Sequence, residues 1–132
     1  MSFDWSTYLE VAQELASGGT EAKRRSSISR AYYSAFCTAR EWLAEHDSAF
    51  HPPKTGDSHK AIWDRFNEGP ERQKLQVAKE GSKLKFSRTE ADYNGKYAGC
   101  NDDRTAQAEL LRARTVLKLL RELAEASARR GT

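Results

Sequence analysis

The sequence has few residues of the kinds that cross-link a chain, break helices or cross a membrane. It contains two cysteines, three prolines and one methionine in 132 residues. No apolar run approaches the ~20 residues that a membrane span requires, and the start of the chain, MSFDW, lacks the basic and apolar regions of a secretory signal. We therefore expect a soluble cytoplasmic protein that does not contact a membrane.

Disulfide, metal and cofactor chemistry are not indicated. Cys37 and Cys100 lack the close pairing of a zinc site, and an intracellular chain keeps such thiols reduced, so we interpret Cys37 as a small buried hydrophobe. No two of the histidines His46, His51 and His59 have the i, i+4 spacing of a helical ligand set. We expect structural or solvated histidines, no metal and no cofactor.

The charge is nearly balanced. Lys and Arg number 22 against 19 Asp and Glu, and the formal charge of +3 does not by itself demand a nucleic-acid partner. Any anion-binding role must therefore come from local clusters. Basic residues cluster at 23–25, 79–88 and 112–121. Such runs on helices are usually solvated faces.

The spacing of apolar residues indicates an all-α fold in one domain, residues 1–132, with 129–132 frayed. Helical periodicity dominates, and the alternation of β-strands is almost absent. We expect helices at about 4–17, 21–45, 58–67, 71–92 and 102–128. Gly18-Gly19 ends the first, Thr20 caps the second, and Gly81 is a candidate kink in the fourth. Residues 49–56 and 94–101 are expected to be loops.

The segment 26–42, SSISRAYYSAFCTAREW, mixes core-like and polar residues at helical spacing. An apolar stripe follows steps of three or four residues, through Ile28, Ala31, Tyr32, Ala35, Ala39 and Trp42. Arg30 and Tyr33 run beside it. Because a buried or half-buried arginine needs partners, this central helix predicts either a polar network inside a bundle or a groove that binds an anion.

A second polar concentration lies at 83–97, KLKFSRTEADYNGKY. Arg88 and Asp92 are four residues apart and face the same way on the predicted helix, with Tyr93 close to its end. Arg88 could bind a phosphate while the acid or the phenol orients it or handles a proton. The alternative is an ordinary intrahelical pair that contributes ~0.3 to 0.5 kcal/mol.

The two polar segments could form one site. A groove could hold phosphates and stack an unpaired base if four basic and three aromatic residues converge on it: Arg30, Lys83, Lys85, Arg88, Tyr32, Tyr33 and Tyr93. Such a groove fits single-stranded RNA or a nucleotide and does not read duplex sequence.

The order of these motifs resembles a known family. The motifs are SRAYYSAF on a long helix, a short helix containing His59, RTEADY and a closing Ala/Leu-rich helix. Over almost the whole chain, this order is similar to that of the small stand-alone HEPN (higher eukaryotes and prokaryotes nucleotide-binding) domains. The resemblance implies an antiparallel four- or five-helix bundle, commonly a homodimer. The family includes RNA-cleaving toxins and non-catalytic members, and a minimal nucleotidyltransferase is a recurrent partner protein.

The ribonuclease members of that family carry a histidine after the arginine, with four to six residues between them. Arg88 matches the arginine, but the three corresponding positions hold Tyr93, Asn94 and Gly95. A phenol titrates near pH ~10 and offers little base at neutral pH, so Tyr93 is a poor substitute for histidine. His59 is the histidine that a bundle could bring towards Arg88.

We therefore expect an RNA- or nucleotide-binding protein, as one component of a toxin–antitoxin or defence pair, whose ligand contacts Arg30, Tyr33, Lys83 and Lys85. One alternative is a metal-independent endoribonuclease in which Arg88, Asp92 and Tyr93 act on RNA by attack of the ribose 2′-hydroxyl on the adjacent phosphate. The other is a helical module that binds a partner protein and no nucleic acid.

Overall fold

The chain is all-helical over the residues described by the computed structural model, 3–54 and 58–131. Its elements are α1 (Thr7–Ala16), α2 (Glu21–His46), α3 (Ser58–Phe66), α4 (Arg72–Tyr93), the short 3-10 helix η1 (Ala98–Cys100) and α5 (Arg104–Arg130). No strand occurs in these ranges, and the all-α prediction is confirmed. The main departure from the expected elements is η1, which lies in a predicted loop. Parts of two other predictions lie outside the described residues. These are positions 55 and 56 of the other predicted loop, and Thr132 of the predicted frayed end.

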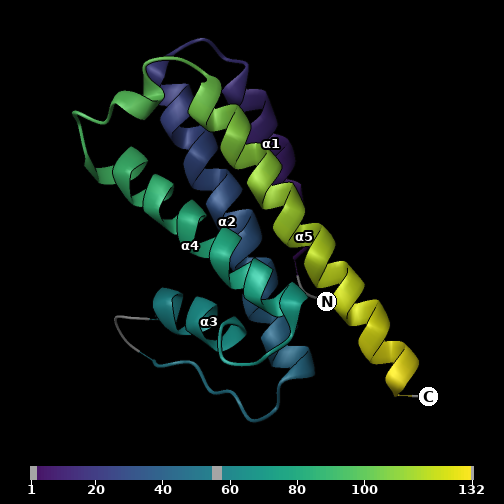
Figure 1. The fold of residues 1–132 in the computed structure, drawn as a ribbon. Helices are drawn as coiled ribbons and strands as arrows, with labels where there is room; N and C mark the ends of the chain where they lie inside the picture. The colour runs from purple at the N-terminus through teal and green to yellow at the C-terminus, as the bar shows by residue number, and fades with distance from the viewer. Residues whose placement is uncertain (1–2, 55–57, 132) are drawn as a thin grey trace.

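The long helices form an antiparallel bundle. In Figure 1, α1, α2, α4 and α5 run in alternating directions, and the short α3 lies at one end of the bundle between α2 and α4 in the chain. The last turns of α5 extend beyond the other helices. The helical bundle expected from the sequence is thus confirmed.

Helix α2 is the central element. Thr20 caps it in an extended conformation, with its side chain accepting a hydrogen bond from the Lys23 N–H, and Gly19 precedes it at a φ of 81°. The helix packs against α1, α4 and α5, and also contacts α3. Its predicted apolar stripe is buried, with Ile28, Ala31, Tyr32, Ala35, Ala39 and Trp42 all in the core. The side of α2 that carries Tyr33 is only partly covered.

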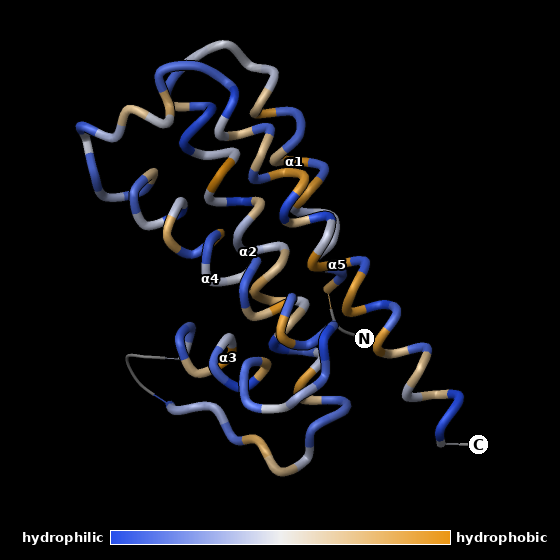
Figure 2. The backbone as a smooth tube through the Cα atoms, in the orientation of Figure 1, coloured by the Kyte–Doolittle hydropathy of each residue, from blue (hydrophilic) through white to orange (hydrophobic). Residues whose placement is uncertain are grey.

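The hydropathy of the helices differs between α5 and α4. Figure 2 shows hydrophobic segments recurring along α5, whereas α4 is largely hydrophilic. Helix α5 buries eight residues and α4 buries five, so α4 depends more on polar contacts for its position. One of these is the ion pair at 2.6 Å between Arg112 on α5 and Glu80 on α4. None of the described helices combines the length and apolar character needed to cross a membrane.

Gly81 permits a close contact between α3 and α4. Helix α4 continues through this residue, from Arg72 to Tyr93. A Cβ atom added at Gly81 would lie 2.2 Å from Cε3 of Trp63, which is far inside van der Waals contact. The glycine is therefore required by the indole that packs on it, which fixes the spacing of the two helices.

The basic cluster at 23–25 serves the fold. Arg24 donates hydrogen bonds to the carbonyls of Cys100 and Asn101. Arg25 donates to the carbonyls of Ala91, Asn94 and Gly95, where α4 ends. Carbonyls at a helix C-terminus lack intrahelical partners and carry partial negative charge, so a cation stabilises them. The expected solvated face is therefore wrong for these two arginines.

Candidate functional site

Arg88 joins α4 to α2 on the partly covered side of the bundle. Its Nε donates to Asp92 Oδ2 at 2.9 Å, and its Nη2 donates to Tyr33 Oη at 2.8 Å. The guanidinium carbon lies 5.1 Å from the centre of the Tyr33 ring and 5.6 Å from that of Tyr93. The Arg88 side chain is only 15% exposed. Such contacts to aromatic rings and a second helix exceed those of an ordinary intrahelical pair.

The Arg88 guanidinium has donors to spare. It carries five N–H groups, and the described residues accept two of them, leaving Nη1 without an acceptor. Asp92 also accepts a hydrogen bond from Ser29 Oγ, at 3.3 Å, so this carboxylate is held by two helices. Asp92 thus orients Arg88, and the free edge of the guanidinium can bind an anion.

His59 lies in the same cluster. Its Nδ1 is 2.7 Å from Tyr32 Oη, its ring stacks on Phe36 at 4.0 Å between ring centres, and it lies 5.9 Å from the ring of Tyr33. The pKa of His59 is lowered, firstly by burial and then by nearby positive charges, led by that of Arg88. The sequence singled out this histidine, but only the packing of α3 sets these distances.

Tyr32 is a core residue and offers no surface for stacking. It is fully buried, and its hydroxyl also accepts a hydrogen bond from Trp63 Nε1 at 3.2 Å. Burial raises the pKa of Tyr32 well above its usual range. Tyr93, in contrast, is 75% exposed. Of the three tyrosines expected in the groove, Tyr93 is therefore the most exposed, Tyr33 is partly exposed and Tyr32 is buried.

Two of the expected basic residues do not join Arg88. Arg30 lies over the ring of Tyr8 on α1, 5.2 Å from its centre. Lys83 is exposed and stands five residues before Arg88, which places the two side chains about 140° apart around α4. The expected convergence of four cations is therefore only partial.

Lys85 and Arg40 supply the other positive charges. Both lower the pKa of His59, and the Arg40 guanidinium lies 5.6 Å from the centre of the Phe36 ring. Sequence reasoning missed Arg40, although its place seven residues after Tyr33 puts it on the same face of α2.

We call Tyr33, His59, Lys85 and Arg88 together the Arg88 site.

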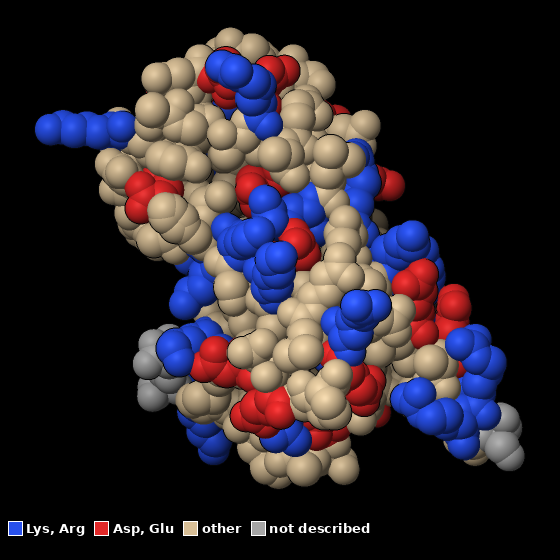
Figure 3. Space-filling model, viewed as in Figure 1, with Lys and Arg blue, Asp and Glu red and all other residues tan. Residues whose placement is uncertain are grey.

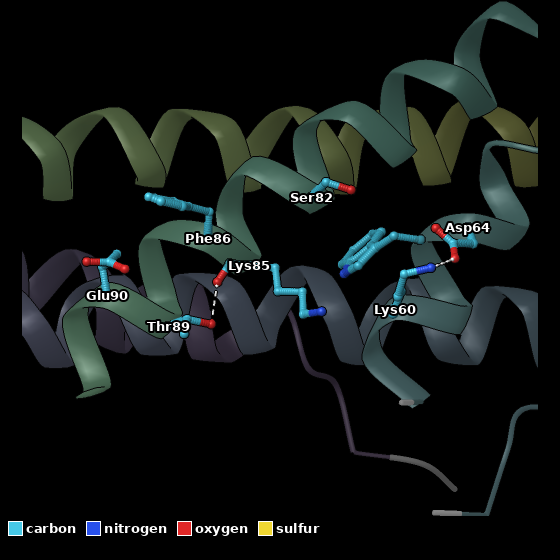
Figure 4. A pocket seen from close by; sticks show the side chains of 8 residues that line it. Lys60, Asp64, Ser82, Lys85, Phe86, Thr89 and Glu90 are labelled. Atoms are coloured by element: carbon cyan, nitrogen blue, oxygen red, sulfur yellow. Dashed lines mark hydrogen bonds and ion pairs between the residues drawn. The ribbon is translucent and has the colours of Figure 1, made fainter. Parts of the chain in front are cut away.

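A groove of about 420 Å³ adjoins this site between α3 and α4, and its lining includes Trp63, Phe86 and Lys85. Figure 4 shows Lys85 reaching from α4 into the space between Thr89 and Lys60. Phe86 is 56% exposed. Lys85 thus belongs to both the groove and the Arg88 site, so a ligand at the site has an apolar surface beside it. No pattern in the sequence indicates this groove, because its two walls come from different helices.

Basic residues on α4 and α5 lie among acidic side chains, and some of those on α5 are bonded to other residues of the fold. Figure 3 shows Lys and Arg gathered over the middle of one face of the molecule, around α4, with acidic side chains among them. Arg112 pairs with Glu80 and Glu109, and Arg114 donates to Gln13 Oε1 at 2.9 Å. This mixture of charges is unlike the continuous basic stripe of proteins that track a duplex.

Cys37 and Cys100 are both free and buried, and burial raises the pKa of each thiol. Cys37 is a small core residue, as predicted. Within residues 3–54 and 58–131, no three His, Cys, Asp or Glu side chains form a group that could hold a metal ion. The chain matches no protein-family model, no curated protein and no solved structure. Its function is therefore inferred from its own residues and their geometry.

Proposed function

We propose that the protein binds a phosphate group of single-stranded RNA or of a nucleotide at the Arg88 site. One observation carries the proposal: the mostly buried Arg88 is held by Asp92 and Tyr33, yet its Nη1 has no acceptor among the described residues. A fixed guanidinium with free donors matches the fork geometry by which arginine binds phosphate. Because it is held on two sides, little side-chain entropy is lost on binding.

The surroundings of Arg88 support an anionic ligand that carries a base. Lys85 and Arg40 add positive charge, and their effect on the pKa of His59 reflects a positive local potential. The exposed ring of Tyr93 lies beside the guanidinium and can stack with an unpaired base. The ligand class is therefore a phosphate joined to an accessible base.

Binding can be measured with a fluorescent single-stranded RNA, and separately with a nucleoside monophosphate, at low salt. Arg88→Met should weaken binding at least tenfold, because a charge-assisted hydrogen bond contributes roughly 1.5 to 3 kcal/mol. Arg104→Met removes the same charge from an exposed position at the start of α5 and should change affinity less than about twofold. Equal affinities of the two variants would remove the assignment. Preference for RNA or for the monophosphate identifies the ligand.

A second candidate is metal-independent RNA cleavage, in which His59 would donate a hydrogen bond to the phosphate and would not act as the base. No histidine follows Arg88 in the sequence, but His59 contacts the ring of Tyr33, to which Arg88 is bonded, and the Arg88 charge contributes to lowering the pKa of His59. Arg88 would stabilise the pentacovalent phosphate, with Asp92 and Tyr93 around it. Purified protein with excess EDTA should then cut RNA, and Arg88→Ala should abolish the cut. Cleavage that survives this substitution would exclude the mechanism.

The wider HEPN-like assignment is part of the same proposal. It is supported by the helical bundle and by the contact of Tyr33 with Arg88, which joins the two segments that carry the resemblance. It includes a homodimer and a pair with a minimal nucleotidyltransferase, in a toxin–antitoxin or defence system. Light scattering of the purified chain tests the dimer. The neighbouring reading frame, followed by co-purification of its product, tests the partner.

A further inference from the structure

Three side chains from α2 and α3 form a hydrogen-bond chain that ends at the Arg88 site. Trp63 Nε1 lies 3.2 Å from Tyr32 Oη, and Tyr32 Oη lies 2.7 Å from His59 Nδ1. An indole N–H can only donate, so the Tyr32 oxygen accepts this bond. The phenolic proton then points to His59 Nδ1, which must accept it. A neutral imidazole that accepts at Nδ1 carries its proton on Nε2.

The opposite arrangement leaves a buried donor unsatisfied. If His59 Nδ1 carried a proton, both Trp63 and His59 would donate to the Tyr32 oxygen. The Tyr32 hydroxyl proton would then have no acceptor among the described residues, in a side chain that is fully buried. An unsatisfied buried donor loses its full hydration, so this arrangement is disfavoured. The hydrogen-bond chain therefore opposes both the other tautomer and the cation.

The charges around His59 act in the same direction. The cations that act on it come from two helices, with Arg40 on α2 and Lys85 and Arg88 on α4. Among the described residues, Asp92 on α4 is bonded to Arg88, and Asp64 on α3 pairs with Lys60. Two ionisable side chains that the structure describes in ring contact with His59, Tyr32 and Tyr33, are phenols. A second proton on the imidazole would meet three positive charges.

We infer that Trp63 and Tyr32 hold His59 as a neutral imidazole with its proton on Nε2, and that this Nε2–H donates to the anion bound at the Arg88 site. The second half of the inference rests on the proposed phosphate binding. Nε2 lies across the ring from Nδ1, away from Tyr32, and His59 is half-buried. His59 is thus a binding group, and not a base that accepts a proton from the ligand, since Nε2 already carries one.

The tautomer can be observed in the unliganded wild-type protein. ¹⁵N-histidine NMR, with His59→Gln to assign the signal, should show neutral His59 protonated on Nε2 from about pH 8 down to about pH 6. A signal from the Nδ1–H tautomer, or from the cation at about pH 6, would overturn the inference. Tyr32→Phe removes the hydrogen-bond acceptor and donor between Trp63 and His59, and should convert the signal to a mixture of tautomers. If that variant does not fold, the wild-type spectrum still decides the question.

The donor role is tested with inorganic sulfate, which keeps its double charge throughout this pH range, at constant ionic strength. Wild-type affinity should change less than about twofold between about pH 8 and about pH 6. His59→Ala should weaken binding roughly tenfold, and His59→Gln, whose amide is a neutral donor, should recover most of that loss. A several-fold rise in wild-type affinity towards pH 6, or equal losses in the two variants, would overturn the donor role. If wild type binds no sulfate, the phosphate proposal and the donor role fail together, while the NMR result on the tautomer stands.

Discussion

Gly81→Ala should destabilise the protein although alanine is the better helix former. The added Cβ would lie 2.2, 2.3 and 2.5 Å from the Trp63 ring atoms Cε3, Cζ3 and Cδ2. Ordinary carbon contacts are about 3.5 to 4.0 Å, so the indole must withdraw by more than about 1 Å. Trp63 is only 2% exposed and packs against Tyr32 and Phe36, so its ring has little room to move.

The net effect follows from three contributions. Overpacking in a dense core costs about 1 to 3 kcal/mol, and a displaced indole also loses its hydrogen bond to Tyr32, worth about 1 kcal/mol. Replacing a helical glycine by alanine stabilises the folded state by about 1 kcal/mol, because alanine has the higher helix propensity. We therefore expect the free energy of unfolding of Gly81→Ala to fall by about 1 to 3 kcal/mol.

Urea denaturation followed by circular dichroism measures this change. The matched control is Ser82→Ala, the next residue on α4, which is exposed and should gain a few tenths of a kcal/mol from helix propensity. If Gly81→Ala is as stable as wild type or more stable, then the indole does not pack on α4 as described. The His59 NMR signal should shift in Gly81→Ala and not in Ser82→Ala, because only the first moves Trp63.

Two further predictions concern the end of α4 and the effect of pH. Arg25→Met removes the donor to the carbonyls of Ala91, Asn94 and Gly95 and should lower the free energy of unfolding by about 2 kcal/mol. The control, Lys96→Met, changes an exposed position nearby and should alter the free energy of unfolding little. Equal effects of the two substitutions would contradict the stabilising role of the Arg25 hydrogen bonds. The pKa of His59 is lowered in the folded state, so its contribution to stability is present above its unfolded pKa of about 6.5 and is lost as the pH falls below that value. Urea midpoints between about pH 7.5 and 5.5 should therefore decrease for wild type and decrease less for His59→Gln, and identical slopes would show that His59 is not the group responsible.

Local patterns predicted the helices closely, because each helix is encoded by spacings of three and four residues and by its caps. The apolar stripe of α2 and the N-cap at Thr20 depend only on neighbouring residues, and both are observed. The pairing of Arg88 with Asp92 has the same origin, since both lie on one helix. In contrast, η1 is a single turn of three residues without a periodic pattern.

Contacts between helices were predicted less well. Tyr33 and Arg88 are 55 residues apart, and the sequence suggested that they face one groove without fixing their contact. Proximity in the sequence groups Lys83 with Arg88, although five positions on a helix turn the side chain away. The sequence offers Gly81 as a candidate kink and does not show that an indole from α3 packs against it.

By itself the sequence determined that this chain is helical, where most of its helices begin and end, and that arginine and tyrosine line the polar edge of the central helix. These properties follow from interactions within one or two turns. Only the tertiary structure decided that His59 meets Tyr32 across 27 residues, that Trp63 donates to the same hydroxyl, and that Arg88 keeps free donors. The reason is physical: such contacts depend on how helices cross and how closely they approach, and the packing of buried side chains along their whole length sets both.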